Sequence, residues 1–126
     1  MEKEYLLDLH KDHKTWQEEL AFYSNNLISL RNRLSEVSIQ NTNHDLKKAV
    51  EQFQNQFIIQ KEQIDILNHD IQISEDAIEA NIKANPVASD HRKMSEKTDL
   101  ADRMETFKKL FVEMKETFND FVGKNL

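Results

Sequence analysis

Cysteine is absent from the sequence, and glycine and proline each occur once, as Gly123 and Pro86. The lack of cysteine excludes disulfide bonds, thiolate metal sites and cysteine nucleophiles. A loop that cradles phosphate groups needs several glycines, so a nucleotide-binding loop of that kind is also excluded. Sheets connected by tight turns use glycine and proline repeatedly, and the near absence of both predicts long, uninterrupted helices.

Long apolar runs are missing as well. No segment approaches the roughly 18 apolar residues of a membrane-spanning helix, and the first residues lack the apolar core of a signal peptide. The formal net charge of −6 disfavours general nucleic-acid binding, and aromatic residues do not alternate with the basic ones. We therefore expect an acidic, cytoplasmic protein that binds neither membranes nor nucleic acids.

Apolar residues recur instead at alternating intervals of three and four residues in three long segments. Charged residues make up 32% of the chain and hydrophobic residues 38%, a balance typical of amphipathic helices. The spacing predicts helices over residues 3–39, 43–84 and 90–123 that pack through coiled-coil-like heptads. The predicted core positions are Leu6, Leu9, His13, Trp16, Leu20, Tyr23, Leu27, Leu30, Leu34 and Val37, then Leu46, Val50, Phe53, Phe57, Gln60, Ile64, Leu67, Ile71, Ser74 and Ile78, and finally Leu100, Met104, Phe107, Phe111, Met114, Phe118 and Phe121.

Helix-breaking and helix-capping residues stand at the ends of these segments. Asn41 is expected to adopt a left-handed conformation after the first helix, and Thr42 or Asn43 to cap the second. Pro86 ends the second helix because proline cannot continue the hydrogen-bond ladder. Gly123 is expected to stop the third helix.

The connections between the helices are short, at about three and ten residues, so consecutive helices run antiparallel. The sequence therefore predicts an all-α fold in which residues 1–126 form a single domain, an up-down-up bundle of three long helices. In size and topology this bundle resembles a spectrin-type three-helix unit, with an aromatic residue, here Trp16, in the core of the first helix. The resemblance implies the fold and nothing about activity or partners.

No catalytic residue and no cofactor is predicted for this chain. None of the five histidines follows a carboxylate by three residues, as in the di-iron carboxylate bundles, and the zinc-protease motif H-E-x-x-H does not occur. His10 and His13 lie on neighbouring turns of the first helix, but two ligands make an incomplete metal site.

Two polar pairs are predicted within the core. When the first helix folds back onto the second, His13 lies level with residues 69–71, so we expect a hydrogen bond between His13 and Asp70. Such a pair is a polar layer that fixes the register of the helices, a pH switch or a ligand contact. Tyr23 and Gln60 are level in the same way, which predicts a phenol–amide hydrogen bond.

A second apolar line follows the second helix outside the predicted core, where Ile59, Ile66 and Ile73 recur every seven residues. Phe22 and Ile28 are comparable residues on the first helix. These side chains either widen the contact among the three helices or form an exposed patch. An exposed patch would support a homodimer or a partner helix laid alongside.

Charge is unevenly distributed along the bundle. Residues 24–60 and 108–126 contain eight basic and six acidic groups, and the remainder contains nine basic and seventeen acidic groups. The half of the bundle near the connection between the first two helices therefore carries a formal charge of +2, and the other half carries −8. The basic residues near the tip between the first two helices are Arg31, Arg33, Lys47, Lys48, Lys108 and Lys109. This tip is either a solvated surface or a docking site for an acidic partner.

The sequence thus favours a non-enzymatic bundle with a structural or protein-interaction role, as a homodimer or with another protein partner. The isoleucines of the second helix are the predicted interface. The alternative is a small-ligand or metal-binding bundle, with a polar site formed by His10, His13 and Asp70.

Overall fold

The computed structural model describes residues 2–41, 43–84 and 90–126, and that part of the chain consists of three helices without a strand. Within the same residues, no helix has the length and apolar character needed to cross a membrane. The all-α fold predicted from the spacing of apolar residues is confirmed.

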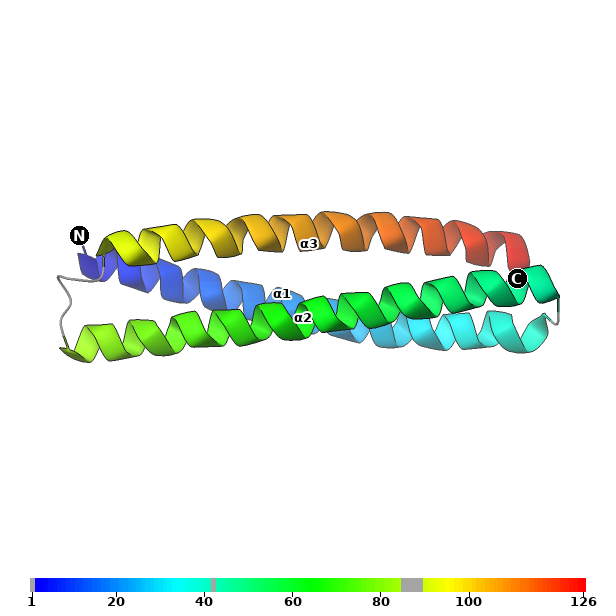
Figure 1. Ribbon diagram of the computed structural model, residues 1–126, viewed down its shortest axis with the longest axis horizontal. Helices are drawn as coiled ribbons and strands as arrows, with labels where there is room; N and C mark the ends of the chain where they lie inside the picture. The colour runs from blue at the N-terminus through cyan, green and yellow to red at the C-terminus, as the bar shows by residue number, and fades with distance from the viewer. Residues whose placement is uncertain (1, 42, 85–89) are drawn as a thin grey trace.

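The three helices are α1 (Glu2–Gln40), α2 (His44–Ala84) and α3 (Asp90–Asn125). Their 39, 41 and 36 residues correspond to lengths of about 54 to 62 Å at a rise of about 1.5 Å per residue. They run side by side in the up-down-up order that the short connections predict (Figure 1). The N-terminus lies at the end where α2 leads into α3, and the C-terminus lies at the opposite end, beside the connection between α1 and α2.

One buried line of residues on each helix forms the core along the length of the bundle. Nearly all predicted core positions are buried, and Leu20, Phe57 and Phe118 are fully so. Phe121 is the exception near the end of α3, because it is half-buried and Val122 is buried instead. An α-helix drifts by about 20° per heptad relative to a strict seven-residue repeat, so the contact line moves to a later residue after several turns.

Aromatic rings from α2 and α3 fill the half of the bundle near the C-terminus. Phe118 meets the ring edges of Phe53 and Phe57, with 5.2 Å between ring centroids in both pairs. Phe121 packs against Phe53 at 5.0 Å. Such edge-to-face and tilted contacts add to the stabilisation that comes from burying the rings.

The α2 helix starts directly after Asn43, one of the two residues expected to cap it. The Asn43 side chain accepts a 2.9 Å hydrogen bond from the backbone N–H of Asp45, which satisfies one of the free donors of the first turn. The acidic side chain of Asp45 also lies in this turn, where the helix dipole favours a negative charge. The alternative cap, Thr42, lies outside the described residues.

Two expectations about helix ends are wrong. No described residue has a positive φ, so Asn41 is not left-handed; its side-chain amide instead donates to the carbonyls of Val37 (3.0 Å) and Asn125 (3.1 Å). Gly123 does not stop α3, which continues to Asn125. A glycine permits a left-handed end but does not enforce one, and here the side chain of Asn41 serves the ends of α1 and α3 together.

Candidate functional site: a histidine–carboxylate cluster and an apolar groove

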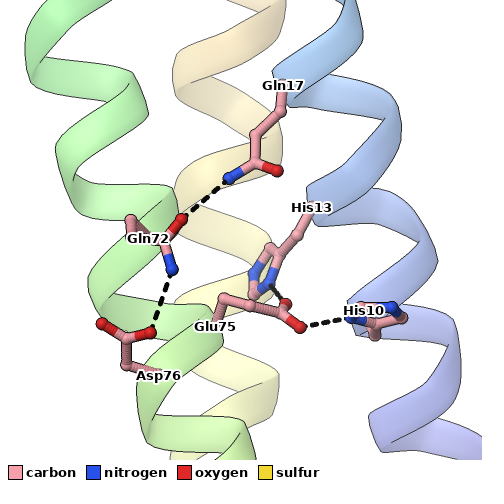
Figure 2. A network of polar contacts seen from close by, with 6 residues as sticks. All are labelled: His10, His13, Gln17, Gln72, Glu75 and Asp76. Atoms are coloured by element: carbon pink, nitrogen blue, oxygen red, sulfur yellow. Dashed lines mark hydrogen bonds and ion pairs between the residues drawn. The ribbon is translucent and has the colours of Figure 1, made fainter.

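His13 is buried in the core, and its polar partner comes from α2. Its side chain is only 1% exposed, and its Nδ1 donates a 2.6 Å hydrogen bond to Oε2 of Glu75. His10, one turn earlier on α1, binds the other oxygen of the same carboxylate through its own Nδ1 (Figure 2). One carboxylate of α2 therefore holds two imidazoles of α1, which favours a single register of the two helices.

The predicted hydrogen bond between His13 and Asp70 is wrong. Asp70 binds Nη2 of Arg103 on α3 at 2.6 Å, so it lies on the other flank of α2. The prediction paired residues whose Cα atoms are equally far from the connection between the helices. Side chains, however, lean toward the N-terminus of their own helix. In this antiparallel pair the side chains of α1 lean away from the connection and those of α2 lean toward it. His13 therefore meets a residue of α2 that lies farther from the connection than residues 69–71, namely Glu75.

The predicted pair of Tyr23 and Gln60 is wrong as well. The Tyr23 ring packs against Phe107 and Phe111 of α3, with ring centroids 5.5 and 4.7 Å apart. The Oε1 atom of Gln60 is buried without a hydrogen-bond partner among the described residues. Tyr23 therefore extends the aromatic packing between α1 and α3.

Further polar contacts continue from the histidine–carboxylate cluster along the same side of the helices (Figure 2). Nε2 of Gln17 donates to Oε1 of Gln72 at 3.4 Å, and Nε2 of Gln72 donates to Oδ1 of Asp76 at 2.9 Å. Figure 2 shows these side chains bridging α1 and α2 next to His13 and Glu75. They link the same two helices as the cluster does.

A small recess lies beside the histidine–carboxylate cluster. The recess beside it, about 310 Å³ in volume, is lined by His10, His13, Lys14, Gln17 and Glu75, and so contains no hydroxyl or thiol nucleophile. Nε2 of His13 is buried without a hydrogen-bond partner among the described residues, so it does not face this recess as a base. In the part of the chain that the structure describes, no three His, Cys, Asp or Glu side chains are placed to hold a metal ion. The two histidines take different oxygens of Glu75 and do not converge on one point.

The basic tip consists of separate side chains with different surroundings. Arg33 forms an ion pair with Glu36 on its own helix at 3.1 Å. Lys108 lies 3.0 Å from Glu19 and 3.1 Å from Glu105, and its hydrogen bond to Glu19 raises its pKa above the ordinary value. Lys108 and its neighbour Lys109 therefore lie near the middle of α3 and not at the tip, contrary to the prediction. Arg31, Lys47 and Lys48 are exposed near the tip. The basic charge of this end is therefore carried mainly by side chains that point into solvent.

The line of isoleucines on α2 is not covered by the other helices. Ile59, Ile66 and Ile73, which we call the isoleucine ridge, are 52%, 47% and 54% exposed. Phe22 and Ile28 are also exposed, but they are six residues apart and so lie about 120° from one another around α1. The three isoleucines of the ridge are aligned along α2 at intervals of seven residues, or about 10 Å, whereas Phe22 and Ile28 are not aligned on α1.

A groove between α2 and α3 borders the ridge. It consists of three adjoining recesses. The central one, of about 360 Å³, shares Ile59 and Leu110 with a recess of about 310 Å³ and shares Arg103 with a recess of about 210 Å³. This α2–α3 groove extends along α2 from Gln56 to Ala77, with Ile59 and Ile73 in its wall, and along α3 from Asp99 to Thr117. The exposed Leu110 belongs to the same surface and was not predicted from the sequence, although it directly precedes the core residue Phe111.

An ion pair crosses this groove. Arg103 binds Asp70 at 2.6 Å and Asp99 at 3.4 Å. The hydrogen bond from Arg103 lowers the pKa of Asp70 below its ordinary value, and the same bond raises the pKa of the guanidinium. The pair joins α2 to α3 above the buried core, at a partly exposed position.

The fold and these surfaces define a class, an all-α three-helix bundle with a polar cluster on one side of α2 and an apolar groove on the other. No protein family, curated protein or solved structure matches the chain. The proposal of a function therefore rests on the arrangement of its own residues.

Proposed function

We propose that this chain is a protein-interaction bundle that binds a partner helix along the α2–α3 groove. The observation that carries the proposal is the isoleucine ridge, which stays about half exposed although the heptad core positions beside it are buried. Isolated apolar residues on a surface need no explanation, but several aligned apolar residues that border a groove are typical of a protein-binding surface.

The dimensions of the groove suit a helix. From Gln56 to Ala77 it extends along α2 for about 32 Å, the length of a helix of about 20 residues. The seven-residue repeat of the ridge is the repeat with which two helices meet side by side. A partner helix in this position would add a fourth member to the bundle.

The energetics require more than one contact of this kind. Full burial of an isoleucine side chain contributes roughly 1.5–3 kcal/mol, so each half-exposed member of the ridge retains roughly 1 kcal/mol. Association itself costs an estimated 4–15 kcal/mol in lost freedom of motion. The partner must therefore cover the whole ridge together with Leu110, and must bring apolar side chains of its own.

Site-specific photocrosslinking tests the proposal. A photoreactive benzoylphenylalanine replaces Ile66 in one variant, and Leu7, which is exposed on α1, in a matched control. After irradiation of cells that express the chain, we expect a covalent protein adduct from position 66 and none from position 7. Substitution of Ile59 and Ile73 by aspartate should abolish the adduct. Equal adducts from both positions, or none from position 66, would contradict the proposal.

A further inference from the structure

We propose that the helix bound in the α2–α3 groove belongs to a second copy of this chain, packed antiparallel to the first about a two-fold axis at Ile66. This inference names the partner of the interaction surface and so rests on the proposed function. Three observations support it: the spacing of the ridge, the distribution of charge and the composition of the apolar surface.

The ridge is symmetric about its central residue. Ile59 and Ile73 each lie seven residues from Ile66, so an antiparallel pairing at Ile66 places each of them opposite the other residue on the second copy. Ile66 also lies within about two residues of the midpoint of α2 (His44–Ala84), so the two copies would overlap along their whole length. A two-fold interface requires a surface that is complementary to itself in this way.

The charge of the two ends favours the antiparallel orientation. One end carries +2 and the other −8, so antiparallel copies place each acidic end against a basic one, whereas parallel copies place the two acidic ends together. Lys47 and Lys48 are exposed at the basic end of α2, and Asp99 and Asp102 are exposed on the α3 wall of the groove toward the acidic end. The attraction acts between solvated groups, so added salt weakens it.

The carboxylates that line the groove, Asp70, Asp99, Asp102 and Glu113, outnumber its one basic side chain, Arg103, which binds Asp70 and Asp99. The attraction between two copies at the groove itself must therefore come from its apolar side chains. The apolar part consists of the isoleucine ridge and Leu110. A second copy brings the same apolar side chains. One association therefore buries the apolar side chains of both copies, and the free energy gained from their burial is twice that of a single ridge.

Disulfide crosslinking in the naturally cysteine-free chain tests the arrangement. The single variant Ile66→Cys should crosslink to itself under mild oxidation, because the two-fold axis brings the two copies of this position together. Ile59→Cys and Ile73→Cys alone should not crosslink. The two copies of either position are offset by 14 residues, or about 21 Å, and a disulfide needs Cα atoms within about 7 Å. A mixture of these two variants should form the mixed disulfide. A parallel dimer would crosslink each variant to itself, and this result would overturn the proposal.

Light scattering provides the second measurement. The chain should have a mass of about twice 14.9 kDa, and Ile66→Glu should weaken the dimer at least about tenfold without loss of helicity. The matched variant Ile28→Glu changes an equally exposed residue on α1 and should leave the dimer intact. If the chain is monomeric at all concentrations while position 66 crosslinks to a different protein, the second copy is wrong and the interaction function stands. If position 66 forms no adduct at all, both are wrong.

Discussion

Glu75 accepts hydrogen bonds from two histidines of α1, but the two bonds have different surroundings. His10 is exposed and can exchange its partner for water, whereas Nδ1 of His13 lies in the core and has Glu75 as its acceptor. A buried donor that loses its acceptor keeps the full cost of its desolvation. The carboxylate therefore matters to the fold chiefly through His13.

Glu75→Ala should lower the free energy of unfolding by about 1–3 kcal/mol, because it leaves the buried Nδ1–H of His13 without an acceptor. Urea denaturation followed by circular dichroism measures the change. In a His13→Leu background the same substitution should cost less than about 0.5 kcal/mol, since no buried donor remains. Equal losses in the two backgrounds would show that Glu75 stabilises the bundle without acting through His13.

The α2 helix uses its two flanks for two different polar contacts. Glu75 faces α1 and binds the histidines, whereas Asp70 faces α3 and binds Arg103. The five residues that separate them turn the side chain by about 140° around the helix, so one helix contacts both neighbours with carboxylates. In the second of these contacts the partner shifts the pKa of the carboxylate.

The ion pair between Asp70 and Arg103 should stabilise the docking of α3 at neutral pH and not in acid. The hydrogen bond from Arg103 holds the pKa of Asp70 below its ordinary value of 3.8. The stabilisation is therefore present above that value and is lost as the pH falls through the lowered pKa. Asp70→Asn should reduce the free energy of unfolding by less than about 1 kcal/mol at pH 7, because the pair is partly exposed. The difference between the two proteins should become smaller as the pH is lowered from 7 to 2.

Urea denaturation of both proteins in the Ile66→Glu background separates this effect from self-association. The control Asp99→Asn removes the longer contact of Arg103, at 3.4 Å, and should have a smaller effect at pH 7. A loss on Asp70→Asn that is the same at pH 2 and pH 7 would contradict the assignment to the ion pair.

The molecule as a whole is a rod whose ends differ in charge and whose middle carries the isoleucine ridge. Binding that occurs only in the folded state raises the thermal unfolding midpoint in proportion to the logarithm of the partner concentration. For a chain that binds itself, the partner concentration is the protein concentration. Self-association thus has a thermodynamic consequence that is independent of any crosslink.

The thermal unfolding midpoint should rise when the protein concentration is raised about a hundredfold, because the folded chain binds a second copy. The rise should be smaller at high salt, where the attraction between the acidic and basic ends is screened. Differential scanning calorimetry measures both effects. Ile66→Glu should have a midpoint that depends less on concentration than that of the parent, while Ile28→Glu should behave like the parent. A midpoint for the parent that does not change with concentration would contradict a dimer.

The sequence by itself determined the three helices, their order and nearly all of the core, because alternating steps of three and four residues place side chains on one face of a helix whatever lies opposite. It also identified His13 and Ser74 as polar residues of the core and the isoleucines of α2 as a line outside it.

Only the tertiary structure decided which side chains meet across helices. The partners of His13 and Asp70 depend on the opposite lean of side chains in antiparallel helices and on the flank of α2 that each neighbour covers, and neither is contained in the periodicity of one segment. Whether the isoleucines widen the core or face solvent depends in the same way on where α3 lies. Its placement leaves the ridge exposed beside an open groove, because burial is a property of the neighbours and not of the residue.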